Sequence, residues 1–444
     1  MVMDMLKMRK LISNFTAIAL LGLSVFNVVA YWGSESAHFN NMIVINNFSV
    51  AFSSILLAIT GLLMFLADKF FEREEEKISD YVSLFVFALV GALMMVSYGN
   101  LATLFVGIEI LSVSQYILAS SNRKSIASTE AGMKYFLIGA FMTGFLLMGI
   151  TLIYGVAGSF DILEINQALL MKPFTLLLSV GVLTLTAAML FKASVAPFHF
   201  WAPDVYTGSP TLVTAFMITV AKIAAFGAIY RLFADTLVTA MPNVEPIIIL
   251  LILVTFVIAN FSALGQSSVK RIMAFSGVSH AGFLLLAIVA SNFSSAGNLF
   301  YYGAAYAFAN VTVFSVIIYV KNVKGSDHVN SFKGLLYKQP ALAIAFIIAT
   351  LSLAGIPPLA GFLGKYLVLL STIQAQYTYV AILAVITSIV SIYYYFKVIV
   401  SMTQKVDQES PFVQPSFSYS AVAWIGVIAI IALGVVPKYF VGLF

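Results

Sequence analysis

Residues 191–210 read FKASVAPFHFWAPDVYTGSP and interrupt a long apolar run with three prolines. A proline removes a helical hydrogen-bond donor, and its ring clashes with the preceding turn. At membrane depth such a break persists only where the backbone is buried in protein or lines water. Lys192 lies a few residues before the first of these prolines, Pro197. The stretch therefore predicts a broken membrane helix that carries a charge.

A second stretch of the same kind, GIPPLAGFLGKY, occupies residues 355–366. It places Pro357 and Pro358 inside another apolar run and follows them with Lys365. The same argument predicts a second broken helix, again with a lysine close to the break.

The rest of the sequence has the composition of a membrane protein. Of its 444 residues, 61% are hydrophobic and only 9% are charged, whereas a soluble domain has about 25% charged residues. A helix needs about 20 mostly apolar residues to span a bilayer. By this rule the chain is an all-α polytopic membrane protein, a single membrane domain over residues 1–444 with about thirteen transmembrane helices. The predicted spans are 11–31, 45–67, 80–97, 100–120, 127–155, 173–200, 211–234, 245–266, 269–291, 297–320, 340–373, 377–400 and 418–440.

The two broken helices are the sixth and eleventh predicted spans and thus lie five spans apart. Helices three to seven (80–234) and eight to twelve (245–403) can therefore form two five-helix repeats with the broken helix fourth in each. An odd number of helices gives the second repeat inverted topology, as in many secondary transporters. The alternative is that two proline kinks share this spacing by chance.

Lys and Arg are distributed unevenly among the loops between these spans. One set of alternate loops holds sixteen of the 23, and the other holds only Lys172, Arg231 and Lys438. Cytoplasmic loops carry the excess of positive charge, so the N-terminus is predicted to be cytoplasmic. With thirteen spans, the C-terminus is then predicted to be periplasmic.

Five ionisable side chains lie inside apolar runs that should be buried in lipid: Glu109, Lys134, Lys192, Lys222 and Lys365. A charge at mid-bilayer costs roughly 2.5–3.5 kcal/mol on insertion scales. Four lysines and one carboxylate in the same chain indicate a path along which protons or cations move.

Several other kinds of site are excluded by the composition. The chain has no cysteine, and its four histidines are scattered without metal-ligand spacing. It contains no glycine-rich phosphate loop and no GxSxG elbow. We therefore expect no metal and no cofactor in this chain. The net charge of +5 follows from topology, so we expect the lipid bilayer and no nucleic acid as a partner.

Four motifs resemble the antiporter-like subunits of respiratory complex I, which are related to subunits of multisubunit cation/proton antiporters. They are the two broken stretches, NLATLFVGIEILSV (100–113) and KRIMAFSGVSHAG (270–282). The resemblance covers about residues 45–440, and the four motifs follow one another in the same order as in the family. Within the family the chain is most similar to bacterial N-type subunits. It ends at Phe444 without room for the lateral helix of L-type subunits, and Lys365 stands where M-type subunits typically have glutamate.

The resemblance implies that Glu109 pairs with Lys192 in a first half-channel. A glutamate facing a lysine that approaches or withdraws has a switchable proton affinity. The alternatives are a structural ion pair for Glu109 and snorkelling of Lys192 to the interface. For Lys134, about two turns into its span, snorkelling and proton transfer both stay open.

By the same resemblance, Lys222 links the first half-channel to the second, and Lys365 is the terminal lysine of the exit half-channel. Lys222 lies mid-span, too deep to snorkel easily. His280 lies mid-span in VSHAGF and has a side chain suited to proton exchange, although a lone buried histidine is often a core residue. His199 either lines the same axis or is structural.

The family implies a proton-translocating membrane subunit of the NADH–quinone oxidoreductase in a bacterial inner membrane. Flavin, iron–sulfur clusters and quinone belong to partner subunits, whose reaction drives the proton transfer. The implied neighbours are K-type and M-type subunits and the lateral helix of the L-type subunit. Two alternatives remain: a subunit of a multisubunit cation/proton antiporter, and a structural scaffold with inert charges.

Overall fold

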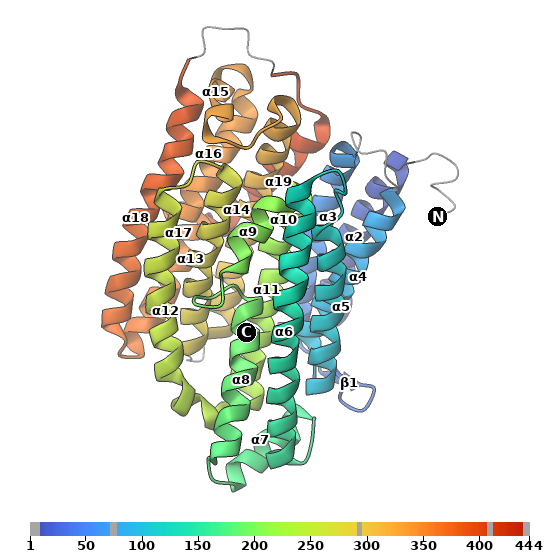
Figure 1. The fold of residues 1–444 in the computed structure, drawn as a ribbon, viewed down its shortest axis with the longest axis vertical. Helices are drawn as coiled ribbons and strands as arrows, with labels where there is room; N and C mark the ends of the chain where they lie inside the picture. The colour runs from blue at the N-terminus through green and yellow to red at the C-terminus, as the bar shows by residue number, and fades with distance from the viewer. Residues whose placement is uncertain (1–8, 72–77, 291–294, 406–411, 438–444) are drawn as a thin grey trace.

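The computed structural model of the protein describes residues 9–71, 78–290, 295–405 and 412–437. These residues form an elongated bundle in which most helices lie side by side along the long axis (Figure 1). In this part of the chain, eleven helices are long and apolar enough to cross a membrane. Two further predicted spans are the broken helices, so the all-α polytopic fold class is confirmed.

The helices of the first half are accompanied by a short antiparallel hairpin of β1 (Ser36–His38) and β2 (Ile43–Ile45) at the edge of the bundle (Figure 1). They are α2 (Arg9–Tyr31), α3 (Asn47–Phe71), α4 (Ile78–Ser97), α5 (Leu101–Ala119), α6 (Ile126–Ala157), α7 (Ile162–Met171), α8 (Leu176–Lys192), α9 (Trp201–Gly208), α10 (Thr211–Phe216), η1 (Met217–Ala221), α11 (Lys222–Arg231) and η2 (Leu232–Thr236).

The second half is entirely helical apart from its connections. Its helices are η3 (Val238–Ala240), α12 (Met241–Leu264), α13 (Val269–Val289), α14 (Ser295–Lys324), η4 (Val329–Phe332), α15 (Leu335–Lys338), α16 (Pro340–Ala354), α17 (Ala360–Gln374), α18 (Thr378–Thr403) and α19 (Phe417–Val435).

The centre of the bundle is formed by the helices that are apolar on all sides. Helices α13 and α14 and the segment from α10 to η2 are almost completely buried, whereas α2 and α6 expose most of their surface. A helix without a polar face has no side for water and packs in the interior or against lipid. The central position of α13 matters because this helix carries His280 and contacts both broken helices.

The first break lies where the prolines predict it. Helix α8 ends at Lys192, and α9 begins at Trp201. The peptide bond before Pro197 is cis. Protein groups bind the freed backbone: Thr255 Oγ1 accepts from the Ala196 amide at 3.1 Å, and the Trp201 indole donates to the Phe191 carbonyl at 3.2 Å. The break is thus buried in protein as far as Ala196, whereas Pro197 and Phe200 are exposed; at membrane depth such a backbone must be covered by protein or line water.

The second break separates α16 from α17. Helix α16 ends at Ala354, followed by Gly355 in the left-handed conformation with φ of 85°. The Pro357–Pro358 bond is cis, and the Gly361 amide donates to Ser352 Oγ at 3.1 Å. Both predicted broken helices are therefore confirmed.

The two broken helices run in opposite directions. In Figure 1 the chain rises from α7 through α8 to α9, but it descends from α15 through α16 to α17. Corresponding pairs also pack alike: α4 contacts α5 as α12 contacts α13, and α6 contacts α8 as α14 contacts α16. This arrangement is the one expected for inverted repeats, although the bounds 80–234 and 245–403 stay a prediction.

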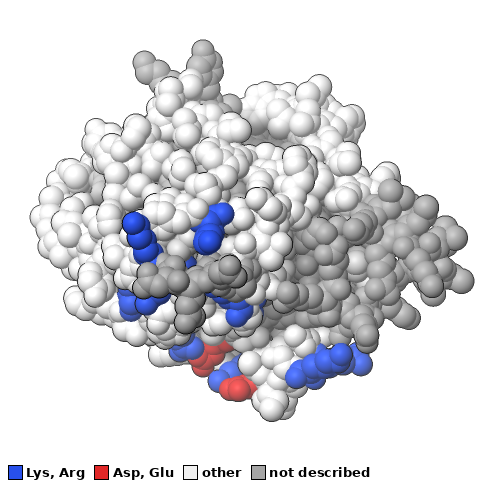
Figure 2. Space-filling model, turned by 90° about the horizontal axis from the view of Figure 1, so that it is seen from above, with Lys and Arg blue, Asp and Glu red and all other residues white. Residues whose placement is uncertain are grey.

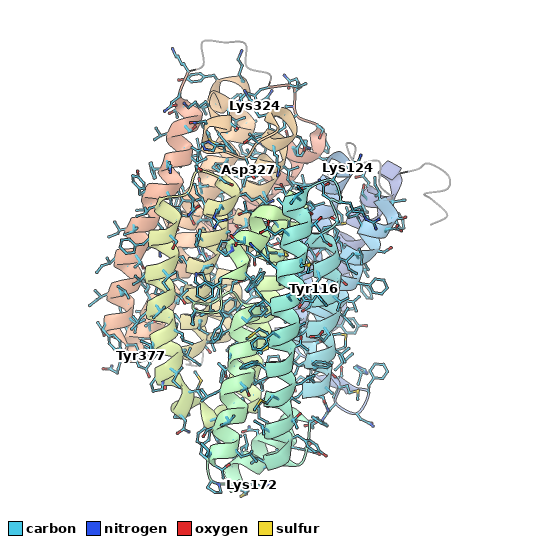
Figure 3. The ribbon with its side chains drawn as sticks, in the orientation of Figure 1. Tyr116, Lys124, Lys172, Lys324, Asp327 and Tyr377 are labelled. Carbon is cyan, nitrogen blue, oxygen red and sulfur yellow. The ribbon has the colours of Figure 1, made fainter. Side chains whose placement is uncertain are left out.

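Basic residues from alternate loops lie at opposite ends of the bundle. Lys124 and Lys324 lie toward one end and Lys172 toward the other (Figure 3). The end that carries Lys324 shows several Lys and Arg side chains and few acidic ones (Figure 2). The alternation of the loops agrees with the predicted topology for these residues, while Lys438 and Phe444 lie outside the described part of the chain.

One feature of the fold has no counterpart in the sequence prediction. The seventh span is not a uniform α-helix, because five residues of π-helix, Met217–Ala221, precede Lys222, and a second π-helical segment follows Arg231. Such π-helical turns are rare and occur frequently at functional sites. No proline or glycine marks the first of them, so the sequence offered no local signal.

Candidate functional site

Lys192 is the last residue of α8, and its ammonium group lies among neutral oxygens. Its Nζ donates to Ser112 Oγ at 2.9 Å and to Gln115 Oε1 and Tyr135 OH at 3.3 Å each. Tyr135 OH in turn donates to Gln115 Oε1 at 2.8 Å. Lys192 is only 7% exposed, so it does not snorkel to the interface.

Glu109 lies on α5, and Thr143 Oγ1 of α6 donates to its carboxylate at 2.8 Å. The expected direct ion pair with Lys192 is absent: within the described residues no such pair lies within 4.0 Å. The reason is geometric, because the ammonium group instead bonds Ser112, about one helical turn further along α5.

A small cavity lies beside Lys192 and reaches Thr143. It has a volume of about 20 Å³, and its lining includes Thr143, which binds Glu109, as well as Ser112 and Lys192. One water needs roughly 10–15 Å³ of such space and two to four polar partners. The cavity can therefore hold about one water, which would connect Thr143 to Lys192.

Lys222 begins α11 directly after the π-helical segment and is 1% exposed. Its Nζ donates to the backbone carbonyl of Gly277 on α13 at 2.7 Å. Among the described residues no carboxylate lies within 4.0 Å of it. This lysine thus joins an element of the first half to one of the second without a counter-ion.

His280 lies in the middle of α13, with both ring nitrogens bonded to hydroxyl groups. Its Nδ1 is 2.6 Å from Tyr302 OH, and its Nε2 is 3.2 Å from Tyr395 OH. Tyr395 OH also bonds Ser276 Oγ at 2.5 Å. Because a hydroxyl both donates and accepts, this ring can carry one proton or two without losing its partners.

Lys365 on α17 reaches back across the second break. Its Nζ donates to the Ala354 carbonyl at 3.1 Å and to Ser388 Oγ at 2.8 Å. Ala354 is the last residue of α16, so Lys365 caps that half-helix, while Lys192 ends α8. The Lys365 ammonium group therefore lies at the negative end of a half-helix dipole. A side chain at Gly355 would strain the backbone and come within 3.0 Å of Lys365 Cδ.

Lys134 does not join these groups. Its side chain is 42% exposed and forms ion pairs with Glu130 at 2.7 Å and Asp204 at 3.3 Å. Asp204 also pairs with Arg271 at 3.0 Å. Lys134 is therefore part of an ion network on the outside of α6, α9 and α13. We call Glu109, Lys192, Lys222, His280 and Lys365 the buried row; Glu109 is half-buried, and the other four are buried.

Two residues counted as loop charges are in fact buried. Lys270 is 0% exposed, and its Nζ donates to the carbonyls of Thr207, at 3.1 Å, and Ser209. It caps the end of α9. Arg231 is 2% exposed and bonds Asp235 at 3.1 Å. The sequence carries no local signal for the burial of Lys270, because a neighbouring element decides whether the first turn of a helix is covered.

His199 lies inside the first break and is 4% exposed. Its Nδ1 has no hydrogen-bond partner among the described residues. The structure thus places it in the interior near the row but does not link it to the row.

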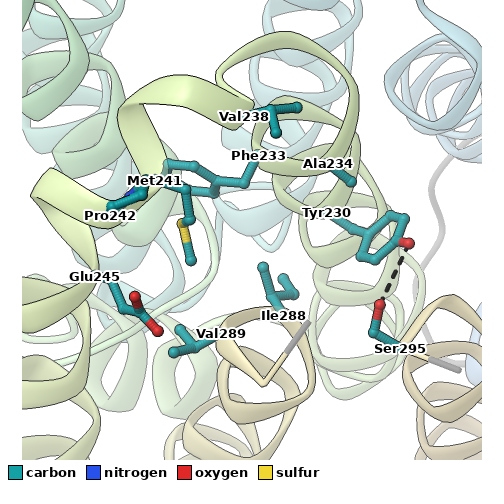
Figure 4. A pocket seen from close by; sticks show the side chains of 10 residues that line it. All are labelled: Tyr230, Phe233, Ala234, Val238, Met241, Pro242, Glu245, Ile288, Val289 and Ser295. Carbon is teal, nitrogen blue, oxygen red and sulfur yellow. Dashed lines mark hydrogen bonds between the residues drawn. The ribbon is translucent and has the colours of Figure 1, made fainter. Parts of the chain in front are cut away.

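A larger cavity lies elsewhere, near the starts of α12 and α14 (Figure 4). It has a volume of about 840 Å³ and a mostly apolar lining that includes Tyr230, Phe233 and Met241. Its one carboxylate, Glu245, accepts from Tyr377 OH at 2.5 Å. No residue of the buried row lines this cavity, so it is not part of the row.

The buried row can hold and pass protons. Amines, an imidazole and a carboxylate titrate, and hydroxyl groups between them donate and accept. The row offers no metal site: in the described part of the chain no three His, Asp or Glu form a group that could hold a metal ion.

Comparison with known proteins agrees with the fold. Residues 98–391 match the model of the family described as "NADH:quinone oxidoreductase/Mrp antiporter, TM". The NADH-quinone oxidoreductase subunit N of Flavobacterium psychrophilum is 43% identical over 430 residues, which cover 97% of this chain and 94% of that protein.

Two solved structures extend the comparison. A chain of respiratory complex I from Thermus thermophilus is 30% identical, with a TM-score of 0.82 and coverage of 98% of this chain and 93% of that one. A chain of the Mrp complex from Dietzia sp. has a TM-score of 0.86 at 20% identity, covering 100% of this chain and 92% of that one. The second likeness concerns the fold alone.

Proposed function

The chain belongs to the family of NADH-quinone oxidoreductase subunit N, and we propose that its buried row carries protons through the membrane. It is a multi-pass membrane subunit of a proton-translocating oxidoreductase. The proposal rests on one observation: three lysines, each at most 7% exposed, form no ion pair within the described residues. A permanent charge without a counter-ion is costly there, whereas an amine that gains and loses a proton avoids that cost.

The first half of the row runs from Glu109 to Lys192. Glu109 exchanges its proton with Thr143, and the water held in the small cavity passes it to Ser112 and Lys192. A charge on Lys222 disfavours a charge on Lys192, because Coulomb coupling is strong at low effective dielectric. Protonating one lysine thus pushes the proton of the next one along the row.

The second half of the row runs from Lys222 past His280 to Lys365. We propose that this chain holds no redox cofactor and that flavin, iron–sulfur clusters and quinone reside in partner subunits. We further propose K-type and M-type subunits and the lateral helix of the L-type subunit as its neighbours. Energy then arrives from these partners as a change in electrostatics or hydration at one end of the row.

The alternative, a subunit of a cation/proton antiporter, shares this architecture. The Mrp chain supports it only through the fold, at 20% identity. The subunit N relatives are about twice as similar and cover nearly the whole chain, which favours the oxidoreductase.

The water in the small cavity is the first testable consequence. A high-resolution structure of the purified complex should show ordered water between Thr143 and Lys192. Thr143→Val should remove that water, because it deletes one of the polar partners the water needs. A dry cavity in the unchanged complex would break the proposed path between Glu109 and Lys192.

The orientation of the chain in the membrane gives a second testable prediction. We propose that the end with Lys124 and Lys324 faces the cytoplasm of a bacterial inner membrane, because that end carries the positive charge. The natural chain has no cysteine, so Lys124→Cys and Lys172→Cys each introduce a single thiol. An impermeant thiol reagent added to intact cells whose outer membrane has been opened should label Cys only in the Lys172→Cys variant. The reverse labelling would overturn the proposed topology.

A further inference from the structure

Tyr306 on α14 is a buried tyrosine whose hydroxyl is left unused by the protein. It is 2% exposed, and its OH has no hydrogen-bond partner among the described residues. Its helix neighbours differ: Tyr302 OH bonds His280, and Tyr301 OH donates to the Leu433 carbonyl at 2.8 Å. A buried hydroxyl without a partner loses its hydrogen bonds to water and gains no hydrogen bond in the protein, which costs free energy.

The position of this hydroxyl is informative. A Cβ atom at Gly277 would lie 3.1 Å from Tyr306 OH, so the hydroxyl faces the backbone of α13 at that residue. The Gly277 carbonyl is the acceptor for Lys222 Nζ at 2.7 Å. The ring of Tyr306 packs on that of His280, with 5.0 Å between the centroids. Tyr306 thus contacts the surroundings of both Lys222 and His280.

No direct hydrogen bond joins Lys222 to His280 within the described residues. The ammonium group bonds a backbone carbonyl, which cannot donate a proton, and both nitrogens of His280 bond tyrosine hydroxyls. Tyr306 lies beside both Gly277, which binds Lys222, and His280. A side chain at position 277 would crowd the Tyr306 hydroxyl, whereas glycine leaves it space.

We propose that the Tyr306 hydroxyl holds a water beside Gly277 and with it forms the proton link between Lys222 and His280. The inference rests on the proposed function of the row. The proton leaves the Lys222 ammonium for the water, which gives one of its own protons to the hydroxyl–imidazole pair of Tyr302 and His280. The lysine becomes a neutral amine and the imidazole an imidazolium, while water and hydroxyls keep their number of protons.

Tyr306→Phe tests the link in the purified complex reconstituted into vesicles. Proton uptake per electron should fall, and the solvent deuterium effect on uptake should rise, because proton transfer becomes slower. Assembly should be unchanged, since the deleted oxygen has no partner in the protein. Tyr301→Phe is the matched control: it deletes a bonded hydroxyl on the same helix and should leave both readouts as they are.

Three outcomes separate the link from the function on which it rests. Normal proton uptake with Tyr306→Phe, together with a loss in Lys222→Ala, overturns the link alone. Normal uptake in both variants overturns the proposed function as well. A high-resolution structure of Tyr306→Phe should lack the water beside Gly277, and water retained there would also overturn the link.

Discussion

Lys222→Ala is expected to slow proton transfer through this chain by roughly 10²-fold or more, the usual contribution of a positioned proton-transfer group. Lys222 is the titratable side chain that connects α11 to α13 through Gly277, so its loss interrupts the row between its two halves. The complex should still assemble, because the substitution removes an unpaired buried charge rather than creating one.

Lys222→Arg should fail in the same way for a different reason. Arginine keeps a positive charge but does not release its proton at any accessible pH. The rate of proton uptake by vesicles, with the rate of quinone reduction measured in parallel, checks both variants. Normal uptake with arginine would show that charge, and not proton exchange, is what position 222 supplies.

Glu109→Gln is expected to impair proton uptake with the same order of magnitude, roughly 10²-fold. The amide oxygen of glutamine can still accept the hydrogen bond that Thr143 donates at 2.8 Å. Packing around α5 and α6 is therefore preserved, while the group that takes up and releases a proton is lost. Uptake by reconstituted vesicles is again the measurement.

Glu245→Gln is the matched control for that variant. Glu245 also accepts a single hydroxyl, that of Tyr377, but it lines the apolar cavity away from the row. Its substitution should leave proton uptake within about twofold. Equal losses in the two variants would mean that any carboxylate on these helices matters for assembly, which would remove the special role of Glu109.

The architecture was predictable because its signals are local. The length of an apolar run sets each span, and prolines inside a run set each break. Pro197 and the Pro357–Pro358 pair therefore located both broken helices, and their spacing indicated the inverted arrangement. The burial of Lys192, Lys222 and Lys365 follows from the same reasoning, because each lies in or beside a run that cannot reach water.

The partners of the buried row were not predictable in this way. Tyr135, Tyr302 and Tyr395 read as ordinary aromatic core residues in the sequence. Their hydroxyls bind Lys192 and His280 because helices far apart in the chain pack with these faces toward each other. Hydrophobic periodicity does not set that rotation in a helix that is apolar on all sides.

The exposure of lysines near the start of a helix was the other property that the sequence did not predict. For Lys134, which lies within a span as predicted, the sequence left snorkelling and proton transfer open, and the side chain lies in the ion network outside the row. Lys270 was counted with the loops, yet it is buried against the end of α9. Both lie in the first turns of a helix, where exposure depends on whether a neighbouring element covers that turn, and no local pattern records this.

The number of protons moved per electron by the complex that carries Lys222→Ala tests the central claim most directly. Purified complex in sealed vesicles would be given NADH and quinone, and proton uptake would be divided by electron flow, so that a slower enzyme does not count as a less coupled one. The buried row predicts a ratio below that of the unchanged complex. An equal ratio in a fully assembled complex would show that protons do not pass through Lys222. That result would contradict the proposed role of the row.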